Sequence, residues 1–398
     1  MLVLVFTLGA SSVRATSLFL QEANPSVPAN SKRIQGNGNS RSFEKLAKQA
    51  QAAMDADQIP DAIRLYKRAT TLKPTWSEGW WHLGTLFFDA GRFNEAREAF
   101  THFVSVERKQ PGPGFAMLGL VEFQLKDYPK ALAALEHGKK LGLGTDQAFI
   151  NSVLFYDGIL QNLQGEPEIA LQRLTLAANE IAAAHPEAPK DAVFADLKLL
   201  DAFGVAALRI PKLPSDLSEA QVPLVRQAGR AQALIALQDY VAAEPEFKQM
   251  LALYPSEPGV HYMYGVFLLK EHPSQAIDEF RREIEISPNH AVARIQLALE
   301  FLRTADYEQS QKYAREAVEL APRNFAAHVA YGRLWLALGK NESALQELRT
   351  AVELAPGSPH AHLALSRALY KAGQKTEAAH EQAEYERLKA LSDAADNQ

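Results

Sequence analysis

The chain has 398 residues, of which 47% are hydrophobic and 22% are charged, so its composition is that of a globular protein and not of a disordered one. Its 42 basic and 47 acidic side chains give a formal net charge of −5, which argues against a dedicated nucleic-acid binder, because such proteins normally carry a basic surplus. The absence of cysteine excludes disulfide bonds, thiolate metal sites and cysteine nucleophiles.

The first residues have the layout of an export signal. An apolar run over residues 2–10 is followed by small residues, with Val13 and Ala15 at the two positions that precede a signal-peptidase cleavage site. No Lys or Arg precedes the run, which departs from the usual layout, and the run is too short to span a bilayer. We expect residues 1–15 to be a signal peptide and the protein to be exported, to a bacterial periplasm or outside the cell. A cytoplasmic location is the alternative.

Residues 16–42 are rich in Asn, Ser, Gly and Pro and are predicted to be a disordered linker. From residue 43 the sequence changes to regularly spaced apolar and small residues, which is the pattern of amphipathic helices. With one interruption this pattern continues to residue 390. The last residues, 391–398, are predicted to form a disordered tail, and no transmembrane segment is expected.

The helical pattern recurs with a fixed period. Pro288, Pro322 and Pro356 are spaced 34 residues apart, and they end similar phrases, REIEISP, EAVELAP and TAVELAP. In the last of these units the first helix has two aromatic residues and a glycine, and the second helix has small and aliphatic residues before the proline. The residues concerned are Tyr331, Gly332, Trp335, Ala344, Leu348, Ala351 and Pro356.

This pattern resembles the tetratricopeptide repeat family. The resemblance implies an all-α, right-handed solenoid of about nine helical hairpins, in which each hairpin buries its apolar face only by stacking on its neighbours. We predict an N-terminal array of about four repeats over residues 43–184 and a C-terminal array of about five repeats over residues 217–390.

Residues 185–216 interrupt the period. They contain one helical pattern, over residues 191–210, followed by a loop bracketed by prolines, and are predicted to be an irregular helix and a Pro-rich loop. Two interpretations stay open. The segment is either an extra helix or degenerate repeat that adjusts the pitch of the solenoid, or an inserted element that contacts a partner.

Catalytic motifs are not recognisable. The sequence contains no G-x-S-x-G, no H-E-x-x-H and no G-x-x-x-x-G-K-[ST]. His82, His261, His328 and His362 lie near the starts of first helices, without carboxylates or cysteines at metal-ligand spacing, and are predicted to pack between helices. We therefore expect no enzyme activity, no metal, no cofactor and no nucleic-acid partner.

The resemblance also implies that the first helices line a concave groove, where positions opposite the packing stripe contact a ligand. At those positions the N-terminal array has mainly aromatic and apolar residues, and the C-terminal array has basic residues among aliphatic ones. The candidate ligand-contacting residues are Trp81, Phe88, Phe123, Phe155, Tyr262, Lys270, Arg303, Arg333, Arg367, Tyr370 and Lys371. A peptide with an apolar stretch and an acidic end would complement them. Alternatively, the aromatic side chains extend the core and the arginines pair with nearby acids such as Glu300.

These features favour a scaffold or adaptor that holds a protein or peptide partner in its groove, in the assembly of an envelope or secretion complex. The alternative function is an accessory subunit that docks a partner enzyme such as a glycosyltransferase. The sequence leaves the partner and the oligomeric state open.

Overall fold

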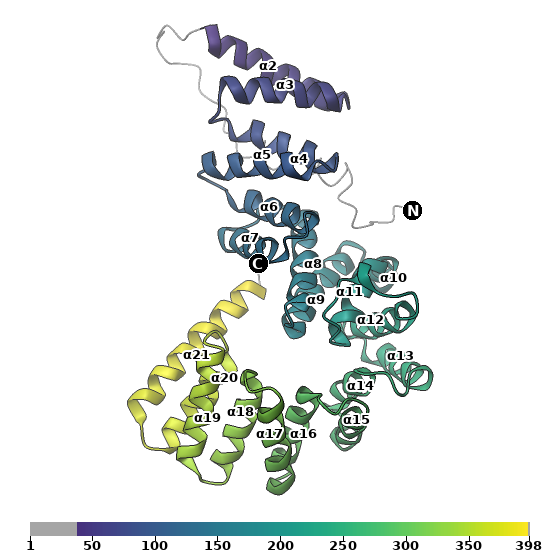
Figure 1. Ribbon diagram of the computed structural model, residues 1–398, viewed down its shortest axis with the longest axis vertical. Helices are drawn as coiled ribbons and strands as arrows, with labels where there is room; N and C mark the ends of the chain where they lie inside the picture. Colours follow the sequence, from purple (N-terminus) through teal and green to yellow (C-terminus); the bar gives the residue numbers. More distant parts are fainter. Residues whose placement is uncertain (1–37, 397–398) are drawn as a thin grey trace. The chain divides into compact units, whose positions relative to one another are not determined.

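The computed structural model describes residues 38–396, and these residues form twenty α-helices and one short 3₁₀ helix, without a strand (Figure 1). They divide into two compact units at residues 247 and 248, inside α13 (Tyr240–Leu253). The predicted signal peptide, residues 1–15, and linker residues 16–37 lie outside the described part of the chain. Residues 38–42, predicted to be linker, are the first residues of α2 (Gly38–Asp55), so that boundary was wrong.

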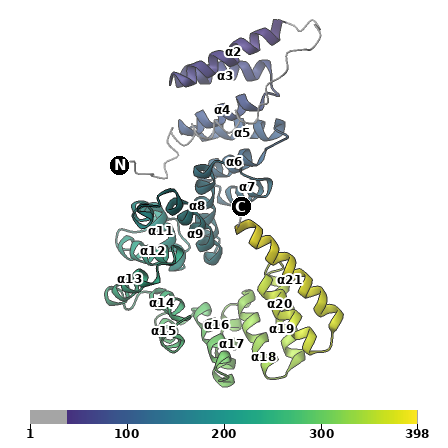
Figure 2. The same cartoon turned by 180° about the vertical axis from the view of Figure 1, so that it is seen from behind.

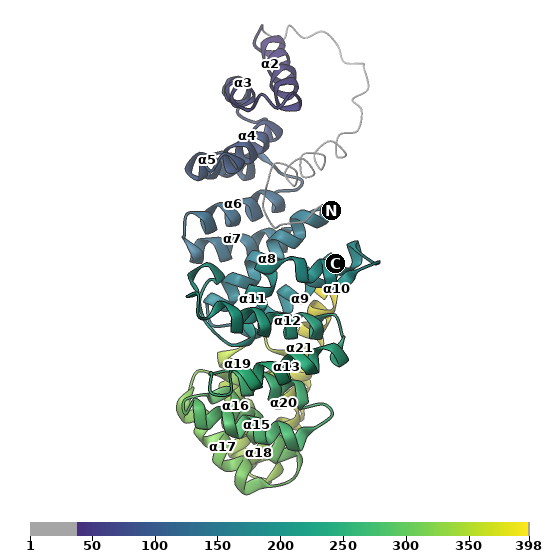
Figure 3. The ribbon, with the colours of Figure 1, turned by 90° about the vertical axis from the view of Figure 1, so that its right-hand side faces the viewer.

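The N-terminal unit begins with four antiparallel helical hairpins. They are α2 (Gly38–Asp55) with α3 (Ile59–Leu72), α4 (Ser77–Asp89) with α5 (Phe93–Val106), α6 (Gly112–Gln124) with α7 (Tyr128–Leu141), and α8 (Gln147–Leu163) with α9 (Pro167–Ala184). The second helix of each hairpin packs against the first helix of the next, as α3 does on α4 and α5 on α6. Figure 3 shows the two helices of the α6–α7 hairpin side by side.

Small residues allow the two helices of a hairpin to approach closely. A Cβ atom on Gly84 of α4 would lie 2.6 Å from the Phe100 ring of α5, and one on Gly119 of α6 would lie 2.6 Å from Leu135 of α7. The glycines that the repeat pattern predicts are therefore packing positions, where the second helix supplies a large side chain that fills the space a Cβ would need.

One turn recurs between the helices of the hairpins. After α4, Gly91 adopts φ +69°, its N–H donates to the Phe88 carbonyl (3.0 Å), and the N–H of Arg92 donates to the Phe87 carbonyl (2.8 Å). This pair of bonds satisfies carbonyl groups that the helix end would leave free. The residues with positive φ at the equivalent places are Asp57, Gly91, Lys126, Gly165, Arg209, Gln238, Ala305, Gly339 and Gly373.

The interruption of the period folds as a further hairpin with an extra helix. It consists of α10 (Pro189–Ala195), α11 (Leu197–Ala207), the 3₁₀ helix η1 (Pro214–Asp216) and α12 (Val222–Ala236). The prediction of a single helix over residues 191–210 was wrong. The chain breaks at Asp196, whose side chain accepts a hydrogen bond from the Leu199 N–H (3.0 Å) and thereby caps α11.

Helix α11 occupies the place of a first helix, and α12 is its partner. The two cross so closely that a Cβ on Gly204 would lie 1.9 Å from the Val225 carbonyl oxygen, and one on Gly229 would lie 1.9 Å from that of Leu200. Helix α11 also packs against α8 and α9. The predicted C-terminal array began at residue 217 with α12 as a first helix. Helix α12 packs against α11, and it is also joined to α13 by the recurrent turn at Gln238 and by a contact between Arg230 and Glu246 (3.1 Å), so that boundary stays a prediction.

The C-terminal unit contains four more hairpins (Figures 1 and 2). They are α14 (Val260–Leu268) with α15 (Pro273–Ile286), α16 (Ala291–Arg303) with α17 (Tyr307–Leu320), α18 (Phe325–Ala337) with α19 (Asn341–Leu354), and α20 (Pro359–Lys371) with α21 (Lys375–Asp396). Helix α21 includes residues 391–396, which were predicted to be a disordered tail, so that boundary was also wrong. None of the helices in the described part of the chain has the length and apolar character that crossing a membrane requires.

Candidate partner-binding face

Most of the aromatic side chains predicted to contact a ligand lie in the core. Trp81, Phe88 and Phe155 are 2%, 6% and 3% exposed, and Tyr262 is 8% exposed. Trp81 of α4 packs edge-on against Phe100 of α5, with ring centroids 5.7 Å apart. For these four residues the prediction of ligand contact was wrong, because the stacked hairpins enclose their rings.

Phe123 is half-buried and belongs to the same packing. Its ring lies 4.7 Å from that of Tyr156 on α8 and 5.6 Å from that of Tyr128 on α7. Of the two interpretations that the sequence left open, the aromatic residues of the N-terminal unit follow the one in which they extend the core.

The basic residues of the C-terminal unit are exposed instead. Helix α18 packs against both α16 and α20, so three first helices lie next to one another. Arg333 on α18 and Arg367 on α20 occupy equivalent places, 34 residues apart, and Lys371 lies one turn beyond Arg367. We define the basic face as Arg303, Arg333, Arg367, Tyr370 and Lys371, which are all exposed, Tyr370 by 67%. Lys270 on the loop after α14 is also exposed.

Three cations of the basic face have no acidic partner. Arg303 forms an ion pair with Glu300 of its own helix (2.9 Å), as the alternative interpretation predicted. Arg333, Arg367 and Lys371 make no ion pair or hydrogen bond with any residue in the described part of the chain. Because no ion pair holds these three side chains, their charges are available to an acidic ligand.

Aliphatic side chains lie among the cations. Leu302 of α16 and Leu336 of α18 are half-buried and occupy places equivalent to Tyr370 on α20, each 34 residues apart. The basic face therefore offers charge and apolar contact together. Arginine and tyrosine are enriched among the residues that dominate binding energy at protein interfaces.

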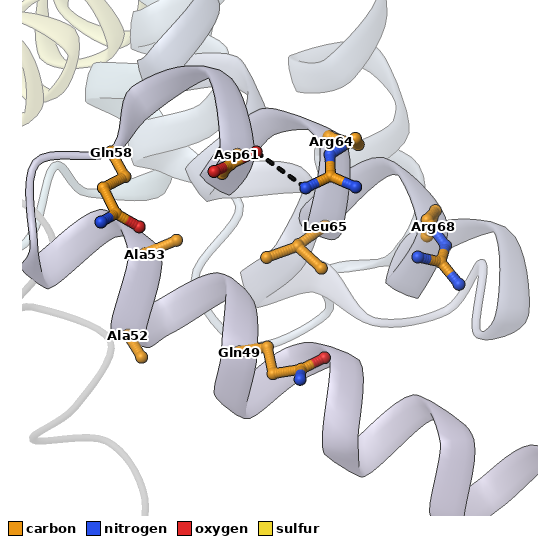
Figure 4. A pocket seen from close by; sticks show the side chains of 8 residues that line it. All are labelled: Gln49, Ala52, Ala53, Gln58, Asp61, Arg64, Leu65 and Arg68. Carbon is orange, nitrogen blue, oxygen red and sulfur yellow. Dashed lines mark hydrogen bonds and ion pairs between the residues drawn. The ribbon is translucent and has the colours of Figure 1, made fainter.

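A separate cavity of about 440 Å³ lies on the first hairpin (Figure 4). It is lined by Gln49, Ala52, Ala53, Gln58, Asp61, Arg64, Leu65 and Arg68. Arg64 and Asp61 form an exposed ion pair across one side of it (2.7 Å). None of the residues that the sequence singled out lines this cavity, and an exposed pair between residues three apart on one helix is an ordinary surface contact.

Two carboxyl groups have pKa values well above the ordinary range for aspartate. Burial raises the pKa of Asp89, near the end of α4, to about 6, and burial likewise raises the pKa of Asp196 to about 6. Asp196 is the cap of α11, so its burial has a structural explanation. Within residues 38–396 no group of three or more His, Asp or Glu side chains is placed to hold a metal ion. The absence of enzyme activity stays a prediction.

The stacked hairpins and the exposed face define a helical-repeat scaffold for protein interactions. The chain belongs to the tetratricopeptide repeat family. One sequence profile of that family matches residues 47–112, 229–291 and 295–359, and a second matches residues 336–386, so that together they cover more than half of the chain. The prediction of the family and of the all-α solenoid class is confirmed.

Among solved structures, the chain is similar to MamA. One crystal structure of MamA is 15% identical, with a TM-score of 0.36, and the alignment covers 41% of this chain and 96% of MamA. Another, of MamA from residue 41 to its end from Desulfovibrio magneticus RS-1, is 18% identical with a TM-score of 0.37, covering 43% of this chain and 97% of MamA. These similarities are low, and the assignment rests on the repeat profiles. A search of curated proteins finds no match.

Proposed function

We propose that the protein is a scaffold or adaptor whose C-terminal unit binds an acidic segment of a partner protein on the basic face. The observation that carries this proposal is the set of three exposed cations, Arg333, Arg367 and Lys371, without acidic partners in the described part of the chain. Charges arranged in this way raise the rate of encounter with an acidic partner and select against basic ones.

The spacing of the cations indicates the form of the ligand. Packed helices lie about 8–10 Å apart, so the equivalent Arg333 and Arg367 are separated by roughly that distance at their helix axes. A polyproline-II segment has about three residues per turn and rises about 3.1 Å per residue, so carboxylates three residues apart lie on one side of it and match this separation. An apolar side chain between them would contact Leu336 and Tyr370. We therefore propose a segment in the polyproline-II conformation, with two acidic residues three positions apart and an apolar residue between them.

The experiment is affinity capture with three versions of the full chain. The first is the natural sequence, and the second carries Arg333→Glu, Arg367→Glu and Lys371→Glu. The third is a control with the same change of charge at exposed residues of the N-terminal unit, Lys48→Glu, Arg68→Glu and Lys109→Glu. Partners that the control retains and the second version loses are bound by the basic face. Equal capture by all three versions would refute the proposal.

We further propose that the chain is exported and acts in the assembly of an envelope or secretion complex. The apolar run over residues 2–10, followed by small residues, supports export. Mass spectrometry of the chain isolated from an expressing bacterium tests this, since cleavage after Ala15 predicts a mature N-terminus at Thr16 in the periplasmic fraction. An uncleaved chain in the cytoplasm would contradict it.

A further inference from the structure

Three histidines of the C-terminal unit are each held between two hydrogen-bond acceptors. The Nδ1 atom of His261, His328 and His362 lies 2.5, 2.7 and 2.6 Å from a glutamate Oε2. The Nε2 atom of the same rings lies 3.0, 2.9 and 3.0 Å from a proline carbonyl oxygen. The partners are Glu279 and Pro255, Glu347 and Pro322, and Glu381 and Pro356 respectively.

Each ring connects three segments of the chain. The histidine is on the first helix of a repeat, the glutamate is on the second helix of that repeat, and the proline follows the second helix of the preceding repeat. His328, for example, joins α18 to α19 through Glu347 and to the end of α17 through Pro322. We call these three contacts the histidine joints. They lie where consecutive hairpins stack.

The chemistry of the joints favours a charged ring. A proline carbonyl accepts hydrogen bonds and donates none, and an ionised carboxylate does the same, so both contacts are satisfied only when both ring nitrogens carry a proton. A neutral ring leaves a lone pair facing one of the acceptors. The rings are 5%, 7% and 6% exposed, so water has little access to replace the lost bond.

The N-terminal unit makes the same carbonyl contact with a ring that does not titrate. The Trp80 indole N–H donates to the Pro74 carbonyl (2.8 Å), across the same six-residue separation as in the histidine joints. Its ring stacks on His102 of α5, at 4.3 Å, and not against a carboxylate. Within the C-terminal unit, Arg294 of α16 takes the equivalent place and pairs with Glu316 of α17 (2.9 Å).

We propose that the histidine joints make the stacking of the C-terminal repeats proton-dependent, so that it is tight at mildly acidic pH and loosens as the pH rises. The hydrogen bond with Glu279 is the largest cause that raises the pKa of His261 above its ordinary value of about 6.5. A raised pKa means that the stabilisation is complete below the ordinary value and is lost as the pH rises through the raised one.

Other titratable groups lie near the histidine joints and also affect how stability changes with pH. Glu283 of α15 lies near His261, and burial raises the pKa of Glu283 too, so its ionisation also opposes folding as the pH rises. At the first joint, Arg282 contacts Glu279 (3.3 Å). At the second, Tyr331 of α18 interacts electrostatically with Glu347. At the third, His380 lies 3.3 Å from Glu381, and Glu384 of α21 interacts electrostatically with His362. A variant that changes only the joint glutamates separates the joints from these neighbours.

The test is hydrogen–deuterium exchange of the full chain between pH 5.5 and 8.5, corrected for the intrinsic effect of pH on exchange. The variant carries Glu279→Gln, Glu347→Gln and Glu381→Gln. A glutamine amide can donate to a neutral ring at Nδ1 while Nε2–H still donates to the proline carbonyl, so this variant keeps the contacts and removes the need for a charged ring. Because exchange reports local opening, the two units are measured separately in one sample.

In the natural chain we expect peptides from α14 to α21 to exchange faster at pH 8.5 than at pH 6, by on the order of tenfold after correction. The exchange rates of peptides from α2 to α9 should change little with pH. In the Gln variant the exchange rates of the C-terminal unit should no longer depend on pH. Equal pH dependence in both units, or unchanged dependence in the variant, would overturn the proposal. Exchange needs no partner, so this result is independent of the proposed binding function.

One consequence does rest on the proposed function. Helices α18 and α20 carry both the histidine joints and the cations Arg333 and Arg367, so looser stacking would vary the separation of these cations and weaken binding of an acidic segment at high pH. If hydrogen exchange depends on pH but binding of the acidic segment does not, the proposal for the histidine joints stands and the proposed binding on the basic face is contradicted.

Discussion

The two units build the same hairpins but use their first helices differently. In the N-terminal unit, Trp81, Phe88 and Phe155 are enclosed, and Trp80 donates to the Pro74 carbonyl and stacks on His102 without a carboxylate partner. In the C-terminal unit the corresponding contacts are histidine or arginine pairs with glutamate, and the cations of the basic face are exposed on the first helices. One repeat architecture can therefore place stacked rings at a given position in one part of a chain and charged pairs at the same position in another.

The largest expected effect on stability concerns the buried aromatic residues of the N-terminal unit. Trp81→Ala should destabilise the N-terminal unit by about 3–5 kcal/mol, because it removes a large buried ring and leaves a cavity. Arg333→Ala, at an exposed position of the C-terminal unit, is the control and should change stability by less than about 0.5 kcal/mol. Urea denaturation followed by circular dichroism measures both. Similar small losses would show that Trp81 lies on a free surface after all.

A second prediction concerns the charged contacts of the C-terminal unit. A double-mutant cycle with His261→Ala and Glu279→Ala should give a coupling energy of about 1–2 kcal/mol at pH 6, and less at pH 8.5, because the hydrogen bond with Glu279 raises the pKa of His261 and the charged form is lost as the pH rises. The matched cycle in the N-terminal unit, Phe88→Ala with Phe93→Ala, contains no titratable group and should give a coupling that does not change over this range. Coupling at His261 that is independent of pH would remove the distinction between the units.

The smallest expected effect comes from the turns, which occur in both units. Ala305 has φ +60° and Gly339 has φ +71° in equivalent turns of neighbouring repeats. Ala305→Gly should stabilise the chain by about 0.5–1 kcal/mol by relieving a left-handed conformation, and Gly339→Ala should destabilise it by a similar amount. Thermal unfolding of the two variants should therefore shift in opposite directions. Shifts in the same direction would contradict the geometry assigned to these turns.

Much of the fold could be predicted because the repeat leaves local signals. The prolines 34 residues apart end second helices, and glycines such as Gly84 and Gly332 mark the places where paired helices touch. The central hairpin was harder to predict, because its two helices are joined by an irregular loop longer than the turns of the other repeats. The features of the sequence that indicate this hairpin are Gly204 and Gly229. Each lies inside a helical pattern, where the absence of a Cβ allows another backbone to approach closely.

The candidate site was predictable only in its C-terminal half. Helix α4 is apolar around most of its circumference, WWHLGTLFF, and such a helix is buried on all sides, so this stretch could have identified Trp81 and Phe88 as core residues. The histidine joints were missed, because each glutamate lies on the opposite helix. Their signal was a histidine followed 19 residues later by a glutamate, repeated with the period of the array at His328 and His362.

A titration of the full chain with fluorescent extended peptides tests whether the basic face binds acidic protein segments. The peptides differ only in the spacing of two carboxylates around one apolar residue. We expect the tightest binding at a spacing of about three residues, weakening with salt, and at least a tenfold loss in the Arg333→Glu, Arg367→Glu, Lys371→Glu variant. Equal affinity for that variant and for the Lys48→Glu, Arg68→Glu, Lys109→Glu control would contradict the claim.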